Sequence, residues 1–218
     1  YRIAHVYNAG HNGRFLVGSY GYIGGSAGGP EGAALCNIAN TILVYTAYQA
    51  TISSCGIFDV RYLGNTDRNA QWALGIMAQA FSRNTKAPIA PTVNSRAGPV
   101  TKMLLYENAV GMMNITTSGV AYTVGVRSAG GRCLNHLTPL EHEFGAKVFK
   151  ACAGMSREEA NRIAQQLIPK YEQQLTTPSD GKSYAESYNQ KTMEPTTEWQ
   201  QIYDDVYHEV KDLGIPLD

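Results

Sequence analysis

Apolar residues along the chain alternate between two patterns: short, nearly continuous runs, and longer stretches in which they recur every three or four residues. Runs of about four to eight apolar residues are typical of buried strands, and the three- and four-residue recurrence is typical of amphipathic helices. The runs predict strands at 2–9, 14–23, 52–63, 87–94 and 119–126. The recurrent stretches predict helices at 30 to about 50, 68–81, 100–113, from 138 onward, and 156–175.

Three of these helices begin with residues that cap the free amide groups of a first turn. Asp67 precedes the second helix and is a typical N-cap. Thr138 with Glu141, and Ser156 with Glu159, form the S/T-x-x-E pattern of a capping box. The starts of these helices are therefore predicted from local sequence alone.

The first predicted helix has its own start signal and its own apolar face. Pro30 fits the first turn, where its missing N–H leaves no bond unmade. Ala34, Ile38, Ile42 and Tyr45 recur at three- and four-residue steps, which predicts a buried stripe.

Strands that alternate with helices predict right-handed crossovers and a parallel sheet. Four such units fit either half of a (βα)8 barrel or one small doubly wound sheet. After residue 155 the strand pattern stops, and the chain becomes helical and more charged, with breaks at 176–183 and near 194–195. We therefore predict an α/β unit over 1–155 and a helical extension over 156–218 that packs on the barrel or on a neighbouring subunit.

Composition narrows the class of function. Basic and acidic residues are balanced at 18 each, so no basic field is present to neutralise nucleic-acid phosphates. No apolar run reaches the roughly 20 residues that a membrane helix needs. The four cysteines form no CxxC pair, which predicts buried, reduced thiols in a cytoplasmic protein and no metal site. The chain begins inside a predicted strand at Tyr1, so we expect a longer polypeptide.

Ligands of parallel α/β proteins bind in the loops that follow the strands, here 23–31, 63–68, 92–99 and 126–138. The first loop is rich in glycine, but its spacing matches neither GxGxxG nor a phosphate-binding GK[ST] loop. It could present N–H groups to an anion at a helix start, or it could be a tight turn. Glu31 in the first helical turn would repel a phosphate, which favours the turn.

Charged residues in the other loops have alternative roles. Arg61 could hold a substrate carboxylate, or it could pair with Asp59 or Asp67. Two further arginines, Arg127 and Arg132, flank a glycine pair and could form an anion site or cap carbonyl groups. The residues alone do not choose between these roles.

Neither the histidines nor the known nucleophile motifs identify a catalytic site in the sequence. His5 on the first predicted strand is the histidine best placed for function, although the pattern favours a hydrogen-bonded core histidine over a functional one. Neither HExxH nor GxSxG occurs.

Several less common strings occur together along the whole chain. They include IAH at 3–5, VRYLGNTDR at 60–68, GVRSAGG at 125–131 and, above all, GKSYAESYNQKTMEPTTEWQQIYDDVYHEVKDLG at 181–214. In this order they resemble the C-terminal half of the monomethylamine:corrinoid protein methyltransferases.

The resemblance implies a second half of a (βα)8 barrel, in an enzyme used in methanogenesis. Such enzymes transfer a methyl group from a methylamine to the cobalt of a corrinoid held by a partner protein, so this chain would bind no corrinoid directly. Their pyrrolysine lies upstream of the region matched here. We further expect a homo-oligomer.

The chain departs from the family at the pocket. By register, Gly18 stands where the family has a glutamate near the pyrrolysine ring, and Thr92 and Asn94 replace a glutamine and a tyrosine. We therefore expect Gly18, Tyr20, Arg61, Thr92 and Asn94 to shape the substrate pocket, together with Tyr22. Three functions remain open: methyl transfer from a methylated amine, binding of an anionic small molecule at the glycine-rich loops, or binding of a corrinoid protein without catalysis.

Overall fold

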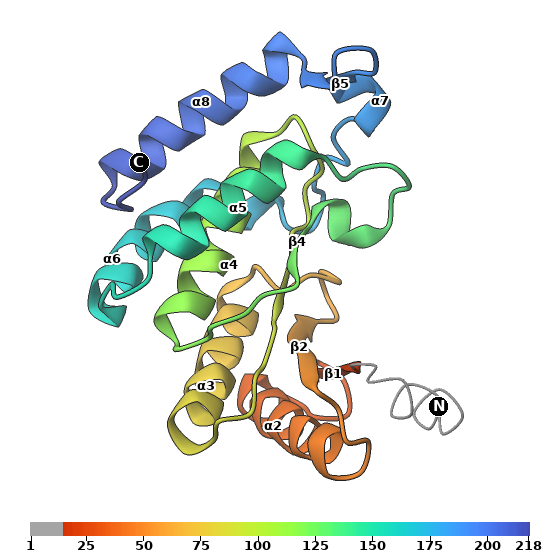
Figure 1. The fold of residues 1–218 in the computed structure, drawn as a ribbon, viewed down its shortest axis with the longest axis vertical. Coiled ribbons are helices and arrows are strands. Elements are labelled where there is room, and N and C mark those ends of the chain that lie inside the picture. Colours follow the sequence, from red (N-terminus) through yellow and green to blue (C-terminus); the bar gives the residue numbers. More distant parts are fainter. Residues whose placement is uncertain (1–14) are drawn as a thin grey trace.

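A computed structural model describes residues 15–218 (Figure 1). The predicted strand at 2–9, with His5, lies outside these residues. Four parallel strands follow one another in the order of the chain: β1 (Leu16–Ile23), β2 (Ile52–Asp59), β3 (Thr92–Asn94) and β4 (Gly125–Arg127). β1 pairs with β2, β3 pairs with β4, and a parallel bridge between Ser53 and Ile89 connects the two pairs. The predicted parallel α/β architecture is therefore present.

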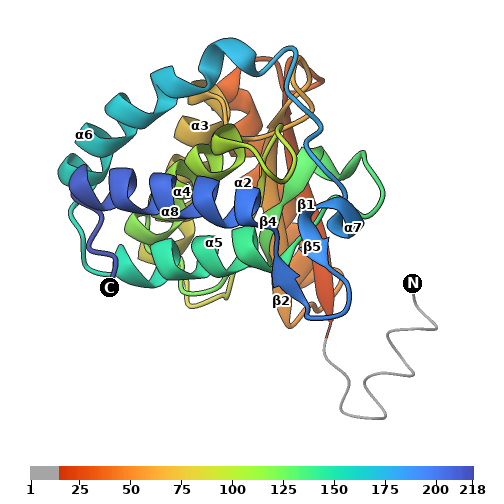
Figure 2. The same ribbon diagram turned by 90° about the horizontal axis from the view of Figure 1, so that it is seen from above.

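A helix follows each strand and lies along the same side of the strands (Figures 1 and 2). These helices are α2 (Pro30–Thr46), α3 (Arg68–Asn84), α4 (Lys102–Thr117) and α5 (Pro139–Ala151). The remaining elements are α6 (Arg157–Leu167), short turns at 168–170 and 172–174, α7 (Tyr184–Ser187), a hairpin of β5 (Tyr188–Asn189) and β6 (Glu194–Pro195), and α8 (Thr197–Asp212). None of the helices described over 15–218 is long and apolar enough to cross a membrane.

The predicted helix starts follow from their caps. Asp67 accepts hydrogen bonds from the N–H groups of the first turn of α3, and Thr138 forms the predicted capping box with Glu141. Ser156 accepts from Glu159 N at 3.1 Å, as the first half of the second predicted box. These contacts are local in sequence, which is why the sequence predicts them.

The last three strands are shorter than predicted, and β4, predicted at 119–126, is regular only over Gly125–Arg127. β2 ends at Asp59 because the chain then turns, with Leu63 in the left-handed region at φ 54°. In the third strand Pro88 and Pro91 cannot donate a ladder hydrogen bond, so regular pairing begins only at Thr92. Their carbonyl groups still accept, from Ser53 N and from Val124 N.

The predicted buried stripe of α2 is wrong in detail. Ile42 is 51% exposed, whereas Asn37 and Thr41 are fully buried. Both polar residues face β1, where Asn37 donates to Ser19 O at 2.9 Å and Thr41 bonds the Ser19 hydroxyl at 2.8 Å. These bonds satisfy the buried polar groups. The buried face of α2 therefore lies about one residue before the predicted apolar stripe.

The prediction that all four cysteines are buried holds for Cys55 and Cys152 and is wrong for two others. Cys36 lies on the outward side of α2, and Cys133 is partly exposed in the loop after β4. All four are free thiols. Over residues 15–218 no cluster of histidine, cysteine and acidic side chains could hold a metal ion.

The segment 156–218 packs against α4 and α5 (Figure 2). Trp199 of α8 is fully buried, and its indole N–H donates to Thr138 Oγ1 at 3.0 Å. Tyr171 is also buried, and its hydroxyl donates to Thr66 O at 2.7 Å. The tail therefore contacts the loops at the carboxyl ends of the strands.

Candidate functional site

The alternation of side chains along the strands defines a face that points away from the helices, which we call the inner face. A Cβ on Gly111 of α4 would lie 2.6 Å from Val93, and one on Gly145 of α5 would lie 2.9 Å from Val126. Val93 and Val126 therefore face the helices. Their neighbours in β3 and β4 point to the inner face because successive side chains alternate. Those neighbours are Thr92, Asn94, Gly125 and Arg127.

A close approach between a glycine and a helix also orients β1. A Cβ on Gly21 would lie 2.4 Å from Ala33 O, so Gly21 faces α2. In β2, Cys55 and Ile57 are fully buried in the core shared with the helices. The inner face of these strands therefore carries Leu16, Gly18, Tyr20, Tyr22, Ile52, Ser54, Gly56 and Phe58. Of the six predicted pocket residues, all except Arg61 lie on the inner face.

The last inward residues of the four strands lie at one level, and we call them the rim layer: Tyr22, Phe58, Asn94 and Arg127. Tyr22 pairs with Phe58, and Asn94 pairs with Arg127. Counted from the bridge between Ser53 and Ile89, Phe58 and Asn94 are each five residues further on. The rim layer therefore combines two aromatic rings, one amide and one guanidinium at the carboxyl ends of the strands.

Glycines make room for the aromatic rings. A Cβ on Gly18 would lie 2.9 Å from Cε2 of Tyr20, and a Cβ on Gly56 would lie 3.2 Å from Phe58 and 3.5 Å from Tyr20. The ring of Tyr20 meets Phe58 edge-on at 5.6 Å, and Tyr22 stacks on Phe58 at 6.0 Å. Tyr20 therefore fills the space beside position 18, where the resemblance places a carboxylate.

Asn65 secures the end of β3. This fully buried side chain donates to Thr92 O and accepts from Asn94 N, both at 2.7 Å. It therefore replaces a neighbouring strand for the backbone that carries Thr92 and Asn94. The sequence predicted only a loop over 63–68, because the pattern does not show where the amide of a loop asparagine points.

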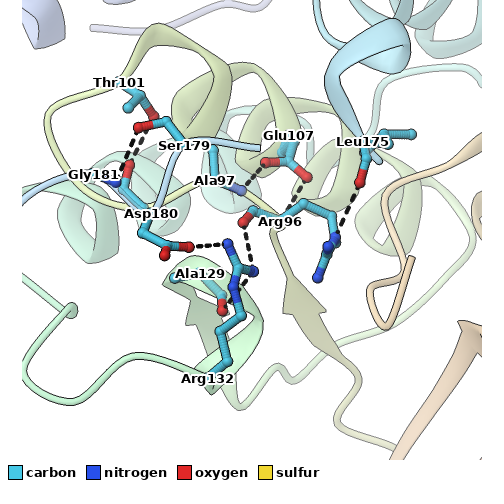
Figure 3. Close-up of polar contacts among 11 residues, drawn as sticks. Arg96, Ala97, Thr101, Glu107, Ala129, Arg132, Leu175, Ser179, Asp180 and Gly181 are labelled. Carbon is cyan, nitrogen blue, oxygen red and sulfur yellow. Dashed lines mark hydrogen bonds and ion pairs between the residues drawn. The ribbon is translucent and has the colours of Figure 1, made fainter. Parts of the chain in front are cut away.

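Glu107 of α4 connects the loops after β2 and β3, and Figure 3 shows its contacts with Arg96 and Ala97 of the loop after β3. Its carboxylate is fully buried and accepts from Arg96 N at 2.7 Å, Ala97 N at 3.0 Å and the Thr66 hydroxyl. Burial raises the pKa of Glu107 to about 7, although these donors lower it. An acid inside the apolar run of the predicted helix 100–113 was the signal that could have identified it.

Arg132 was predicted either to bind an anion or to cap carbonyl groups, and in the structure it caps carbonyl groups. Its Nη1 donates to the carbonyl oxygens of Arg96 and Ala129, each at 3.0 Å, and its Nη2 pairs with Asp180 of the tail (Figure 3). Ala129 itself adopts a left-handed conformation with φ 51°. The guanidinium therefore holds an unfavourable loop conformation in place.

Arg61 is also engaged. Its guanidinium donates three hydrogen bonds to the Asp59 carboxylate, at 2.6, 2.9 and 3.1 Å. Burial raises the pKa of Asp59, but the Arg61 hydrogen bonds outweigh it and the pKa is lowered overall. Arg61 forms one of the structural pairs that the sequence left open, and its role in substrate binding stays a prediction.

The glycine-rich loop after β1 forms a closed turn. Gly24 N donates to Gly28 O at 2.7 Å, and Gly28 N donates to Gly25 O at 3.1 Å. Gly24 and Gly28 have φ values of 80° and 74°, which favour glycine. Two of the amide groups that could have bound an anion are therefore used inside the loop, which favours the tight turn.

The helical side of the strands carries a hollow of its own. A groove of about 290 Å³ runs between α3, α4 and α6, with Trp72, Asn114 and Arg157 among its lining residues. None of its lining residues belongs to a strand or to the rim layer. We therefore place the candidate site on the inner face, where loops of parallel α/β proteins bind ligands.

The fold and the rim layer define a parallel α/β protein with an aromatic and cationic site at the carboxyl ends of its strands. The family model "Monomethylamine methyltransferase MtmB" matches residues 2–215, and the chain belongs to this family. It is 31% identical over 192 residues to monomethylamine methyltransferase MtmB of Methanosarcina mazei, covering 88% of this chain and 42% of the relative. It is also 31% identical, over the same shares, to MtmB3 of Methanosarcina barkeri.

Solved structures agree with the sequence comparisons. The crystal structure of the Methanosarcina barkeri monomethylamine methyltransferase superposes with a TM-score of 0.94 at 27% identity, covering 98% of this chain and 47% of that one. A hydroxylamine complex of MtmB superposes equally well. The chain thus spans less than half the length of the relatives that it matches.

Proposed function

We propose that this chain is part of a methyltransferase that moves a methyl group from a methylated amine to the cobalt of a corrinoid on a partner protein. The family match over residues 2–215 carries the proposal. We further propose that its four strand–helix units are half of a (βα)8 barrel, whose mouth is the rim layer. Under this proposal the corrinoid protein docks over the carboxyl ends of the strands, in a cytoplasmic homo-oligomer.

The chemistry divides between the corrinoid and the protein. A bound corrinoid supplies a Co(I) nucleophile, whose electron pair forms the new bond to the methyl carbon. The carbon–nitrogen bond breaks, and its electron pair stays on the nitrogen. The nitrogen must therefore carry a positive charge beforehand, so that it leaves as a neutral amine. The residues of this chain contribute by binding and orienting the donor and by excluding water.

The inner face supports a donor that brings its own charge. None of the inward strand residues described between 16 and 127 is an aspartate or a glutamate. The nearby acids are engaged: Asp59 pairs with Arg61, Glu107 accepts three hydrogen bonds, and Asp67 caps α3. The aromatic rings of Tyr22 and Phe58 suit a cationic ammonium group.

A spectroscopic assay tests the proposed function. The purified protein is incubated with a corrinoid protein reduced to Co(I) and with methylated amines, and methylcobalt formation is followed by absorbance. We expect methylcobalt with at least one methylated amine, and none when the protein is omitted. Absence of methylcobalt with every primary to quaternary methylated amine would overturn the proposal.

A further inference from the structure

We propose that the methyl donor is a methylated amino acid, whose carboxylate binds Arg127 and whose ammonium group lies against Tyr22 and Phe58. The inference rests on the proposed function and names its substrate class. It follows from the charges of the arginines at the strand ends, from the aromatic rings opposite, and from the amide between them.

Arg127 differs from the other arginines near the strand ends. Asp59 pairs with Arg61, Glu172 pairs with Arg68, and Asp180 pairs with Arg132. Arg96, which follows β3, donates instead to Leu175 O at 3.2 Å. The guanidinium of Arg127 makes no hydrogen bond and no ion pair with any residue of the described part, 15–218, and it is exposed.

The position of Arg127 makes this charge available to a ligand. It is the single charged side chain among the inward strand residues described from β1 to β4. The first acid along the following helix, Glu141, is buried and accepts from Ser128 and Thr138 instead. A planar guanidinium with free donors matches a carboxylate, which it can bind through two parallel hydrogen bonds.

The other end of the rim layer fits a methylated ammonium. Tyr20, Tyr22 and Phe58 form one aromatic cluster, with ring centroids 5.6 and 6.0 Å apart. Tyr22 is 49% exposed, so its ring is accessible. Aromatic faces attract methylated ammonium groups through the electron density of their rings. Because none of the described inner-face residues is acidic, these rings are the groups on that face that would attract a cation.

Asn94 lies between the two ends. Its Nδ2 donates to Thr92 O at 3.3 Å, whereas its Oδ1 accepts no hydrogen bond from the described residues. This oxygen can accept an N–H from a donor that is not fully methylated.

At the rim layer Asp59 bonds Gly64 and Asn65 bonds Asn94, so residues 64–65 lie between β2 and β3. At about 4.8 Å per neighbouring segment, β2 and β4 are separated there by roughly 14 Å. A small zwitterion together with the Arg127 and Phe58 side chains fills that span.

The rim layer disfavours a methylamine that has no carboxylate. A methylamine without a carboxylate would leave Arg127 unpaired beside a second positive charge, which is unfavourable. A zwitterion places opposite charges at both ends. The rim layer therefore distinguishes donors by their carboxylate.

Calorimetric binding without any corrinoid tests the inference independently of catalysis. The probes are N-methylglycine, N,N-dimethylglycine and N,N,N-trimethylglycine, each compared with the N-methylated ethylamine of the same methylation state, which lacks the carboxylate. We expect at least one glycine derivative to bind about tenfold or more tightly than its matched amine, as a charge-assisted pair provides.

Variants assign the preference to Arg127. Arg127→Gln should abolish it, Arg127→Lys should restore part of it, and Arg83→Gln, an exposed arginine on α3, should leave it unchanged. Unfolding curves show that each variant is folded. Equal affinity for both probes in the unmodified protein, or a preference that survives Arg127→Gln, would overturn the inference.

The cobalt assay separates this inference from the proposed function. If methylcobalt forms as fast from the methylated ethylamines as from the matched glycine derivatives, the carboxylate requirement is refuted. The proposed methyltransferase function would be unaffected. Carboxylate-dependent binding through Arg127 with no methylcobalt from any donor would refute the methyltransferase, and would leave a binding site for methylated amino acids.

Discussion

Glu107→Gln should change how the stability of the protein depends on pH. Burial raises the pKa of Glu107 from an ordinary 4.5 to about 7, so the folded protein binds the proton more tightly than the unfolded chain. Its contribution to stability is therefore complete below about pH 4.5 and is lost as pH rises through about 7. At about 1.4 kcal/mol per pKa unit, the whole effect is about 3 kcal/mol, of which about 2.5 kcal/mol falls between pH 5 and 8.

Urea unfolding at pH 5, 6, 7 and 8 measures this effect. The glutamine variant also loses a hydrogen-bond acceptor for Ala97 N, which costs about 1–3 kcal/mol at every pH. The informative quantity is therefore the difference in unfolding free energy between the original protein and the variant, which should shrink by about 2.5 kcal/mol from pH 5 to 8. Glu158→Gln, at an exposed position of α6, is the matched control for charge. A difference that stays constant with pH would refute the reasoning.

Three further substitutions test the packing around the site by urea unfolding. Asn65→Ala leaves a carbonyl and an N–H of β3 without partners and should destabilise by about 2–4 kcal/mol; a loss below about 0.5 kcal/mol would show that Asn65 does not hold the strand end. Gly21→Ala places a Cβ 2.4 Å from a carbonyl oxygen of α2 and should cost more than about 1 kcal/mol, whereas unchanged stability would contradict the close approach. Trp199→Phe removes the bond to Thr138 and should cost about 1–3 kcal/mol, and unchanged stability would argue against that contact.

Local signals predicted much of the fold. The helix starts at Asp67 and Thr138 follow from side chains that bond their own first turn, so a few neighbouring residues determine them. The alternation of strands with helices predicted the parallel pairing. Gly18, Tyr20 and Asn94 lie on the inner face, and their role in a pocket stays a prediction. The early end of β2 was not predicted, because the same apolar run continues into the turn after Asp59.

The polar groups that build the site depend on long-range contacts. Arg132 pairs with Asp180, 48 residues later in the chain, and Glu107 bonds Thr66, 41 residues earlier. Sequence analysis left Arg127 and Arg132 as equivalent candidates. The structure separates them, because Arg132 bonds two loop carbonyls and Asp180 whereas the guanidinium of Arg127 contacts no acid within residues 15–218.

A crystal structure with a bound methylated amine or amino acid tests the central claim most directly. The account predicts difference density on the inner face, between Phe58 and Arg127, with the methyl group directed toward the open carboxyl ends of the strands. Density in the groove between α3, α4 and α6, with an empty inner face, would contradict it.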